Sequence, residues 1–345
     1  MFLARQEKDV NHHCSSPHSA RMRTHRLLLR AFATFAMVLG MAAAGSATVA
    51  ADVVMDTVPV GNGPIGIAVA PDGKRAYVAN NEDDSVSVID TGTNVVVDTV
   101  TVRDAPEGVA ISPDGSFVYV ANALDETVSV IDTGTNVVVD TVTVGDTPQA
   151  VAISPDGSFI YVANALDDSV SVVDTGTNMV VDTVTVGDTP EGVAISPGGS
   201  FAYVTNNFDD SVSVIDTGTN MVVDTVMVGN GPQAVAITPT GTRAYITNTV
   251  DNSVSVIDTG TNMVVGTVTV GDDPRGVAIT PNGKRTYATN FGDGTVSVVD
   301  TGPNVVVDTV PVGNDPLGVA ITPTGNRAYV ANLGDGTASV IAIDQ

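Results

Sequence analysis

A unit of 42 residues is repeated along residues 52–345, and this periodicity constrains the fold more than any single residue does. The region holds seven units, and their shared tyrosine is Tyr77, Tyr119, Tyr161, Tyr203, Tyr245, Tyr287 and Tyr329. Units of about 40–45 residues with several short strands each are typical of the blades of a β-propeller.

Each unit contains four segments with the composition of short strands. Around Tyr119 these are 108–112, 117–122, 127–132 and 137–144, and a Pro-Asp-Gly turn joins the first two. The segment 117–122 is apolar on both faces, so both must be covered. Neighbouring blades of a propeller cover both faces of each sheet. We therefore predict four-stranded antiparallel blades.

The ends of the repeat region predict how the ring closes. The region begins with a fourth-strand segment, 53–60, and ends after a third-strand segment, 337–343. The first strand would therefore complete the last blade and remove the exposed edges. The predicted fold is all-β: a seven-bladed β-propeller closed by its N-terminal strand.

Residues 1–51 lie outside the repeat and resemble a secretory signal peptide. A basic stretch (21–30) precedes an apolar run (31–45) and a small-residue cleavage signal, Val49-Ala50-Ala51. We predict cleavage after Ala51 and a secreted mature chain, extracellular or at the cell surface, without an integral membrane segment. Residues 1–21 would be an upstream extension if Met22 is the true start. The alternative is a disordered tail on a cytoplasmic protein.

The predicted mature chain lacks the side chains of most catalytic and metal sites. All four histidines and the single cysteine, Cys14, lie in residues 1–51. Nucleophilic Ser-His-Asp and Cys-His systems need an imidazole, and zinc, copper and haem sites need imidazole or thiolate ligands. We therefore predict a protein that is not an enzyme and has no cofactor, with a divalent cation such as calcium left open.

The charge of the predicted mature chain favours basic partners. Residues 52–345 contain 8 basic and 37 acidic residues, a net charge of −29. Such a surface repels phosphate backbones, so we predict no nucleic-acid binding. Cationic ligands and basic protein surfaces are favoured. The alternative is that the charge only keeps a β-rich protein soluble.

The second strand of the unit carries a recognisable motif. It is Tyr-Val-Thr-Asn at 203–206, with close variants at 77–80, 245–248, 287–290 and 329–332. With its flanking turns, the whole of 52–345 resembles the YVTN β-propeller repeat family. The resemblance implies seven blades and an extracytoplasmic setting, as in surface-layer and secreted proteins, and implies little about chemistry.

Residues present in every unit are most simply structural. Each unit has a proline before its first strand, and an asparagine that we expect to bond the loop after its second strand. An aspartate on the other side of that loop would act likewise; the seven are Asp83, Asp125, Asp167, Asp209, Asp251, Asp293 and Asp335. The alternative is that this aspartate ring binds calcium blade by blade.

Positions that differ between units are the candidate binding residues. The residue after the repeated proline should border the central channel; this ring is Ile65, Glu107, Gln149, Glu191, Gln233, Arg275 and Leu317. A second ring, three positions earlier, is Asn62, Asp104, Asp146, Asp188, Asn230, Asp272 and Asn314. We predict that the two rings form an acidic channel mouth that binds ligands. The alternative is that these residues lie on solvated loops and vary between units without any role in binding.

These patterns lead to three functional hypotheses. The first is a secreted, non-enzymatic, monomeric binding scaffold whose partner is a protein, a cell-envelope component or a cationic ligand. The second is a carboxylate- or metal-dependent hydrolase or lyase of the propeller lactonase type, using Glu107, Glu191 and Arg275. The third is a structural surface-layer component.

Overall fold

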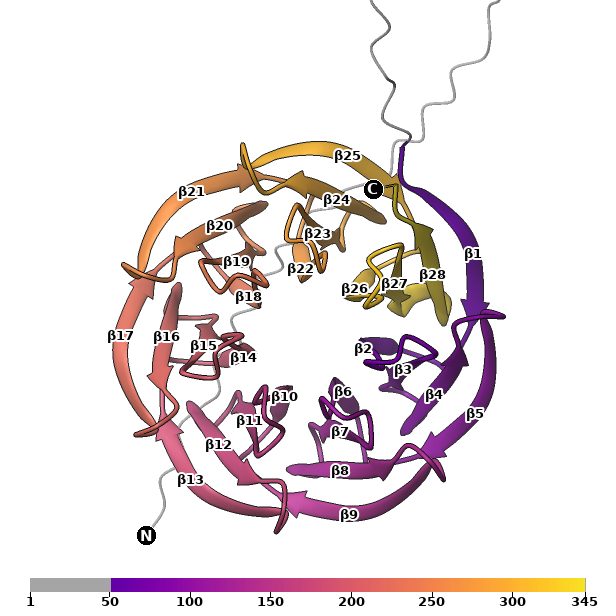
Figure 1. The fold of residues 1–345 in the computed structure, drawn as a ribbon, viewed down its shortest axis with the longest axis horizontal. Coiled ribbons are helices and arrows are strands. Elements are labelled where there is room, and N and C mark those ends of the chain that lie inside the picture. Colours follow the sequence, from indigo (N-terminus) through magenta and orange to yellow (C-terminus); the bar gives the residue numbers. More distant parts are fainter. Residues whose placement is uncertain (1–50, 345) are drawn as a thin grey trace, which may run out of the picture. The chain divides into compact units, whose positions relative to one another are not determined.

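The computed structural model describes residues 51–344, which form seven sheets arranged in a ring (Figure 1). Every sheet has four strands, all antiparallel to their neighbours, so the predicted architecture is confirmed. The basic and apolar leader segments, the histidines and Cys14 lie outside the described residues. Within 51–344 no helix is long and apolar enough to cross a membrane.

Four sets of strands succeed one another from the channel outward. The innermost set is β2 (Pro64–Val69), β6 (Pro106–Ile111), β10 (Pro148–Ile153), β14 (Pro190–Ile195), β18 (Pro232–Ile237), β22 (Pro274–Ile279) and β26 (Pro316–Ile321). The second set is β3 (Arg75–Asn80), β7 (Phe117–Asn122), β11 (Phe159–Asn164), β15 (Phe201–Asn206), β19 (Arg243–Asn248), β23 (Arg285–Asn290) and β27 (Arg327–Asn332).

The third set is β4 (Ser85–Asp90), β8 (Thr127–Asp132), β12 (Ser169–Asp174), β16 (Ser211–Asp216), β20 (Ser253–Asp258), β24 (Thr295–Asp300) and β28 (Thr337–Ala342). The outermost set is β1 (Val53–Pro59), β5 (Val95–Thr101), β9 (Val137–Thr143), β13 (Met179–Thr185), β17 (Met221–Met227), β21 (Met263–Thr269) and β25 (Val305–Pro311). A short 3₁₀ helix, η1 (Leu333–Asp335), precedes β28.

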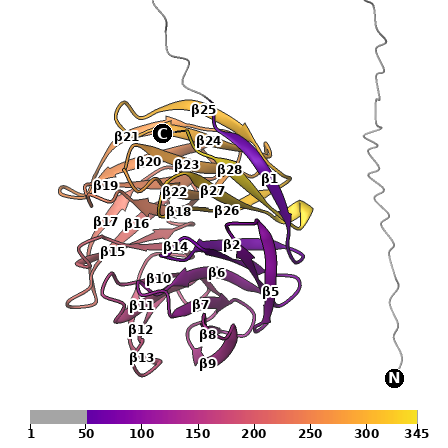
Figure 2. The same cartoon turned by 45° about the vertical axis from the view of Figure 1, so that its right-hand side comes forward.

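The ring closes as the sequence predicts. The last sheet has the order β1-β28-β27-β26, so the first strand of the repeat region is the outermost strand of the seventh blade. β1 pairs antiparallel with β28, from Val53 opposite Ala342 to Pro59 opposite Thr337. Figure 2 shows β1 and β28 lying side by side at this seam.

The hydrophobic core lies between blades. Residues of β1, β27 and β28 pack with residues of β2, β3 and β4, and the second-strand Tyr329 is fully buried in that cluster. Equivalent clusters fill the other blade interfaces. Second-strand residues are therefore buried on both faces. The outermost strands differ from expectation: Val137 and Val139 are 55% and 54% exposed, because these strands form the rim beyond the neighbouring blades.

The asparagine that ends each second strand has a different role from the one predicted. Asn80 donates from Nδ2 to Ser85 Oγ (3.0 Å) and Ser87 Oγ (2.9 Å), hydroxyl groups of the adjacent strand β4. Its Oδ1 accepts a bond from Gly61 N, before β2. Asn80 thus joins β3 to β4 and to the loop before β2, whereas the buried Oδ1 atoms of Asn122, Asn164 and Asn248 have no hydrogen-bond partner within the described residues. The side chain does not bond the loop that it precedes, because the paired β3–β4 register places the hydroxyl groups nearer.

Candidate functional site

A bulge at the start of each innermost strand positions the channel residues. In β6, Pro106 pairs with Asn122 while Val109 pairs with Val120, so the β6 side holds one extra residue, Glu107 or Gly108. The same shift follows the proline in the other six innermost strands. A bulge bends the strand and changes the direction of a side chain. The residue after the proline is thereby aimed at the channel axis.

The channel contains a cavity of about 210 Å³. All seven predicted ring residues line it: Ile65, Glu107, Gln149, Glu191, Gln233, Arg275 and Leu317. The innermost strands approach so closely that a Cβ on Gly66 would lie 2.0 Å from the main-chain oxygen of Glu107. A side chain at Gly66 would therefore collide with the main chain of the next blade, whereas Ala150 and Ala234 are accommodated at the equivalent position of the third and fifth blades.

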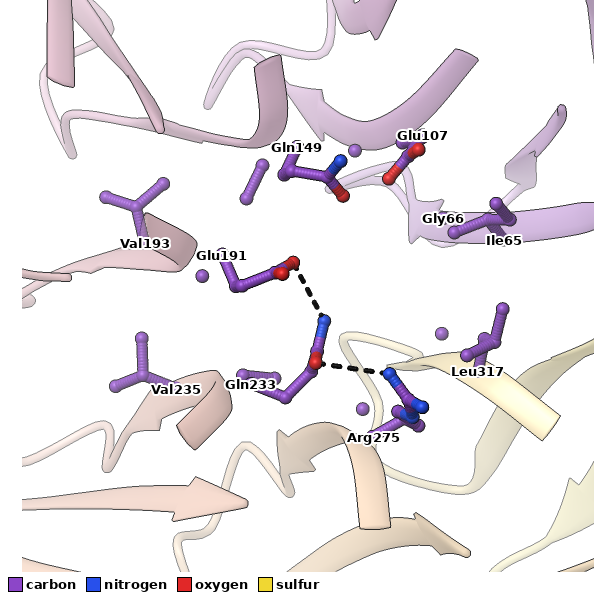
Figure 3. A pocket seen from close by; sticks show the side chains of 16 residues that line it. Ile65, Gly66, Glu107, Gln149, Glu191, Val193, Gln233, Val235, Arg275 and Leu317 are labelled. Carbon is purple, nitrogen blue, oxygen red and sulfur yellow. Dashed lines mark hydrogen bonds between the residues drawn. The ribbon is translucent and has the colours of Figure 1, made fainter. Parts of the chain in front are cut away.

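Three ring residues form a continuous polar chain along the cavity wall. Gln233 Nε2 donates to Glu191 Oε2 at 3.0 Å, and Arg275 Nη1 donates to Gln233 Oε1 at 3.3 Å (Figure 3). The neutral amide thus connects a carboxylate to a guanidinium group two blades away. This arrangement fixes both amide directions and orients the carboxylate of Glu191.

Arg275 is held in place by two further contacts. Its Nη2 donates to Asp273 Oδ2 at 3.0 Å, and its Nε lies 2.9 Å from Asp273 Oδ1, an ion-pair distance without hydrogen-bond alignment. The guanidinium carbon lies 5.3 Å from the centre of the Phe291 ring. The positive charge is therefore compensated at the wall and stacked on an aromatic face.

Glu107 and Glu191 have perturbed acidities. Burial, with a smaller contribution from the charge of Glu191, raises the pKa of Glu107 from 4.5 to about 7, against the lowering effect of the Gln149 amide. Burial also raises the pKa of Glu191, while the bond from Gln233 and the charge of Arg275 oppose it. The cavity thus holds two carboxylates that are poorly solvated in their ionised forms.

The channel wall is not uniform around the ring. Glu107, Gln149, Glu191, Gln233 and Arg275 come from five consecutive innermost strands, β6 to β22. The remaining two strands contribute the apolar side chains of Ile65 and Leu317 (Figure 3). The cavity therefore offers a charged arc facing an apolar arc.

The second predicted ring lies outside the cavity wall. Asp104, Asp188 and Asp272 are exposed on the loops that precede the innermost strands, and Asp146 is half-buried. Their main-chain N–H groups bond to the repeated aspartate of the following loop, as in Asp146 N to Asp167 Oδ2 at 2.8 Å. These bonds hold the two sets of loops together, yet the four aspartate side chains do not line the cavity, so the predicted mouth does not include them.

The repeated aspartates therefore clamp one loop to another within each blade. The bond from the loop before the first strand is present in all seven blades. Within residues 51–344 no group of three or more His, Cys, Asp or Glu is arranged to hold a metal ion.

Sequence reasoning did not single out Asp273. Its position is occupied by Gly, Ala or Thr in the first five units, and by an acidic residue only in the last two. An aspartate two residues before the only cationic ring residue was a detectable signal for an ion pair between the strand and the loop that precedes it.

Two family models match parts of the chain. A YNCE-like β-propeller model matches residues 109–202, and a model described as a lactonase, 7-bladed β-propeller, matches residues 42–143. Each covers less than a third of the chain. The chain is a seven-bladed β-propeller. Neither description names the YVTN repeat or a surface-layer protein, so that resemblance stays a prediction.

A solved structure of a different protein shares the fold. It is the hydrazine synthase of Kuenenia stuttgartiensis, 28% identical in sequence, with a TM-score of 0.76. The similarity covers 81% of this chain and 96% of that one. No curated protein sequence matches the chain.

Proposed function

We propose that this propeller is a secreted, non-enzymatic binding scaffold that receives a cationic group in its channel. The observation that carries the proposal is the pair of half-buried carboxylates, Glu107 and Glu191, in one cavity. Each has a raised pKa because burial penalises its charge. A cation placed between them would favour the ionised forms and offset that penalty.

The size and polarity of the cavity favour the tip of a larger ligand. A cavity of about 210 Å³ is smaller than the ~300–1,000 Å³ typical of small-molecule pockets. A primary ammonium group on an alkyl chain fits both arcs: the ammonium faces Glu107 and Glu191, and the methylene groups contact Ile65 and Leu317. A lysine side chain of a protein or cell-envelope component has this chemistry.

Titration calorimetry with n-butylammonium, and with a lysine-containing peptide, tests this function. Glu107→Gln and Glu191→Gln should each weaken binding by about tenfold or more, since each removes a charged partner of about 1.4 kcal/mol or more. Near pH 6 the binding should release protons, because a cation lowers the pKa of Glu107. Glu82→Gln removes an exposed acid outside the cavity and serves as the matched control. Unchanged affinity in both cavity variants would refute the proposal.

A second function is favoured by one observation. A carboxyl group with a pKa of about 7, such as Glu107, is suited to general acid or base catalysis near neutral pH. The partial match to a lactonase model includes this residue. A panel of lactones and esters, with and without calcium, distinguishes the two functions. Hydrolysis by the wild type that is lost in Glu107→Gln would establish the hydrolase.

A further inference from the structure

Asp52 stands at the seam of the ring and differs from its counterparts in the repeat. One period after Asp52 comes Asn94, and asparagine occupies the same position at 94, 136, 178, 220, 262 and 304. Several of these asparagines accept a bond from a tyrosine hydroxyl of the preceding blade, as Asn304 does from Tyr245 at 2.9 Å. Asp52 accepts the equivalent bond from Tyr287. Asp52 is therefore the seventh member of this set.

The asparagines also donate a bond that the side chain of Asp52 cannot. Their Nδ2 atoms bond an aspartate in an outermost strand of the preceding blade: Asn94 to Asp56, Asn136 to Asp98, Asn178 to Asp140, Asn220 to Asp182 and Asn262 to Asp224, all at 2.8–3.1 Å. The corresponding aspartate for Asp52 is Asp308. An ionised carboxylate has no proton to donate. At the seam the main-chain nitrogen of Asp52 donates to Asp308 Oδ2 instead, at 3.0 Å.

That nitrogen belongs to the residue that follows the predicted cleavage signal. We propose that cleavage between Ala51 and Asp52 creates an α-ammonium group that forms an ion pair with Asp308 and locks the closing strand. Hydrolysis by an external endopeptidase consumes one water molecule; Ala51 keeps the carboxylate and Asp52 gains the amine, which is protonated at neutral pH. The charged nitrogen then supplies the donor that five of the other six positions obtain from asparagine.

The surroundings of Asp52 support an ion pair at this point. Asp52 is 5% exposed, and Asp308 is half-buried, whereas the five corresponding aspartates are exposed. A charged donor bonded to a carboxylate with reduced solvent contact forms a stronger bond than the neutral asparagine amide forms with the same acceptor. The Asp52 carboxylate is satisfied separately, by Tyr287, by Arg285 Nη1 at 3.2 Å and by Asp344 N at 2.8 Å.

The burial of Asp52 also fixes the order of events. Its nitrogen is bonded to Asp308 and its side chain is enclosed in the closed ring, so a peptidase cannot bind the 51–52 bond in an extended form there. Cleavage therefore precedes closure, and the amine that it creates becomes part of the closed seam.

The experiment compares processed and unprocessed full-length chains. Intact-mass measurement of the exported protein should show a chain that begins at Asp52. A bulky Ala51→Tyr substitution blocks cleavage and leaves the nitrogen in a neutral amide. Asp308→Asn should lower the melting temperature by about 2–4 °C more in the processed chain than in the blocked one. Asp98 instead accepts a bond from the side chain of Asn136, so Asp98→Asn should lower the melting temperature by the same amount in the processed and the blocked chain.

A second measurement does not depend on the blocked variant. At pH 6.5, an anhydride that acylates α-amines should react more slowly with the processed wild type than with its Asp308→Asn variant, because the ion pair protects the amine. A mature chain that begins elsewhere would overturn the proposal. So would equal melting shifts for Asp308→Asn in the two forms, or equal acylation rates.

Discussion

Replacing Glu107 by glutamine should stabilise the propeller in a pH-dependent manner. In the folded chain the pKa of Glu107 is raised from 4.5 to about 7. Below pH 4.5 the residue is protonated in both the folded and unfolded chains, so its ionisation costs nothing. Between pH 4.5 and 7 the unfolded chain loses the proton more readily, and the free energy of unfolding falls as the pH rises.

The size of the effect follows from the shift. A difference of 2.5 pKa units, from 4.5 to about 7, corresponds to about 3 kcal/mol. Partial solvent contact of the side chain reduces the expected gain to about 2–3 kcal/mol at pH 8. Glutamine preserves the shape and cannot ionise, so this cost disappears in the variant. In a chain of this size the gain raises the melting temperature by about 4–8 °C.

Thermal unfolding followed by circular dichroism at pH 4 and pH 8 measures this difference. The stability advantage of Glu107→Gln over the wild type should be larger at pH 8 than at pH 4, and Glu82→Gln should show no comparable increase. If the advantage is the same at both pH values, or smaller at pH 8, burial of the carboxylate is not the source of the cost. A more stable variant that no longer binds butylammonium would link the cost directly to binding.

Three further substitutions test the packing of the ring. Asp52→Ala removes the acceptor of Arg285 and should cost about 3 kcal/mol in urea unfolding, against about 1 kcal/mol for Asn94→Ala; equal costs would contradict a special role for the seam. Thr205→Ala removes a 2.8 Å bond to the oxygen of Gln233 in the next blade, and should cost about 1–2 kcal/mol and speed amide exchange of Gly192. Gly66→Ala should lower the free energy of unfolding by about 1–3 kcal/mol, because its Cβ would lie 2.0 Å from the main-chain oxygen of Glu107. Gly198→Ala, whose Cβ meets nothing within 4 Å, should leave the free energy of unfolding unchanged in the same urea assay.

The regularity of the repeat explains why the fold was predictable. The second- and third-strand segments around Tyr119 agree residue for residue with β7 and β8, because their ends are marked by turns. The first strand begins two residues earlier than predicted, at Pro106, since its proline pairs with Asn122 across the bulge. A pattern of apolar residues does not reveal a bulge, which depends on the partner strand.

The candidate site was predictable only in part. The position after the proline identified seven of the sixteen residues that line the cavity, because a repeat transfers one geometric inference to every blade. The aspartates three positions earlier were grouped with them because they lie on the loops before the first strands, which were expected to border the channel mouth; their main-chain bonds to the following loops show a separate location. The bond between Gln233 and Arg275 depends on side-chain conformations across a blade interface, which sequence spacing does not specify.

The seam also determines when the molecule can become complete. Six blades take all four strands from consecutive sequence, so each can pair as soon as its own residues are available. The strand β1 is synthesised first, and its partner β28 is synthesised last. The hydrogen bond from Asp344 N to Asp52 Oδ1 spans 292 residues. Throughout synthesis the chain therefore carries one unpaired strand, which is a site for aggregation or for a chaperone. Loss of the last nine residues, 337–345, would remove β28, leave β1 without a partner and expose the edge of β27.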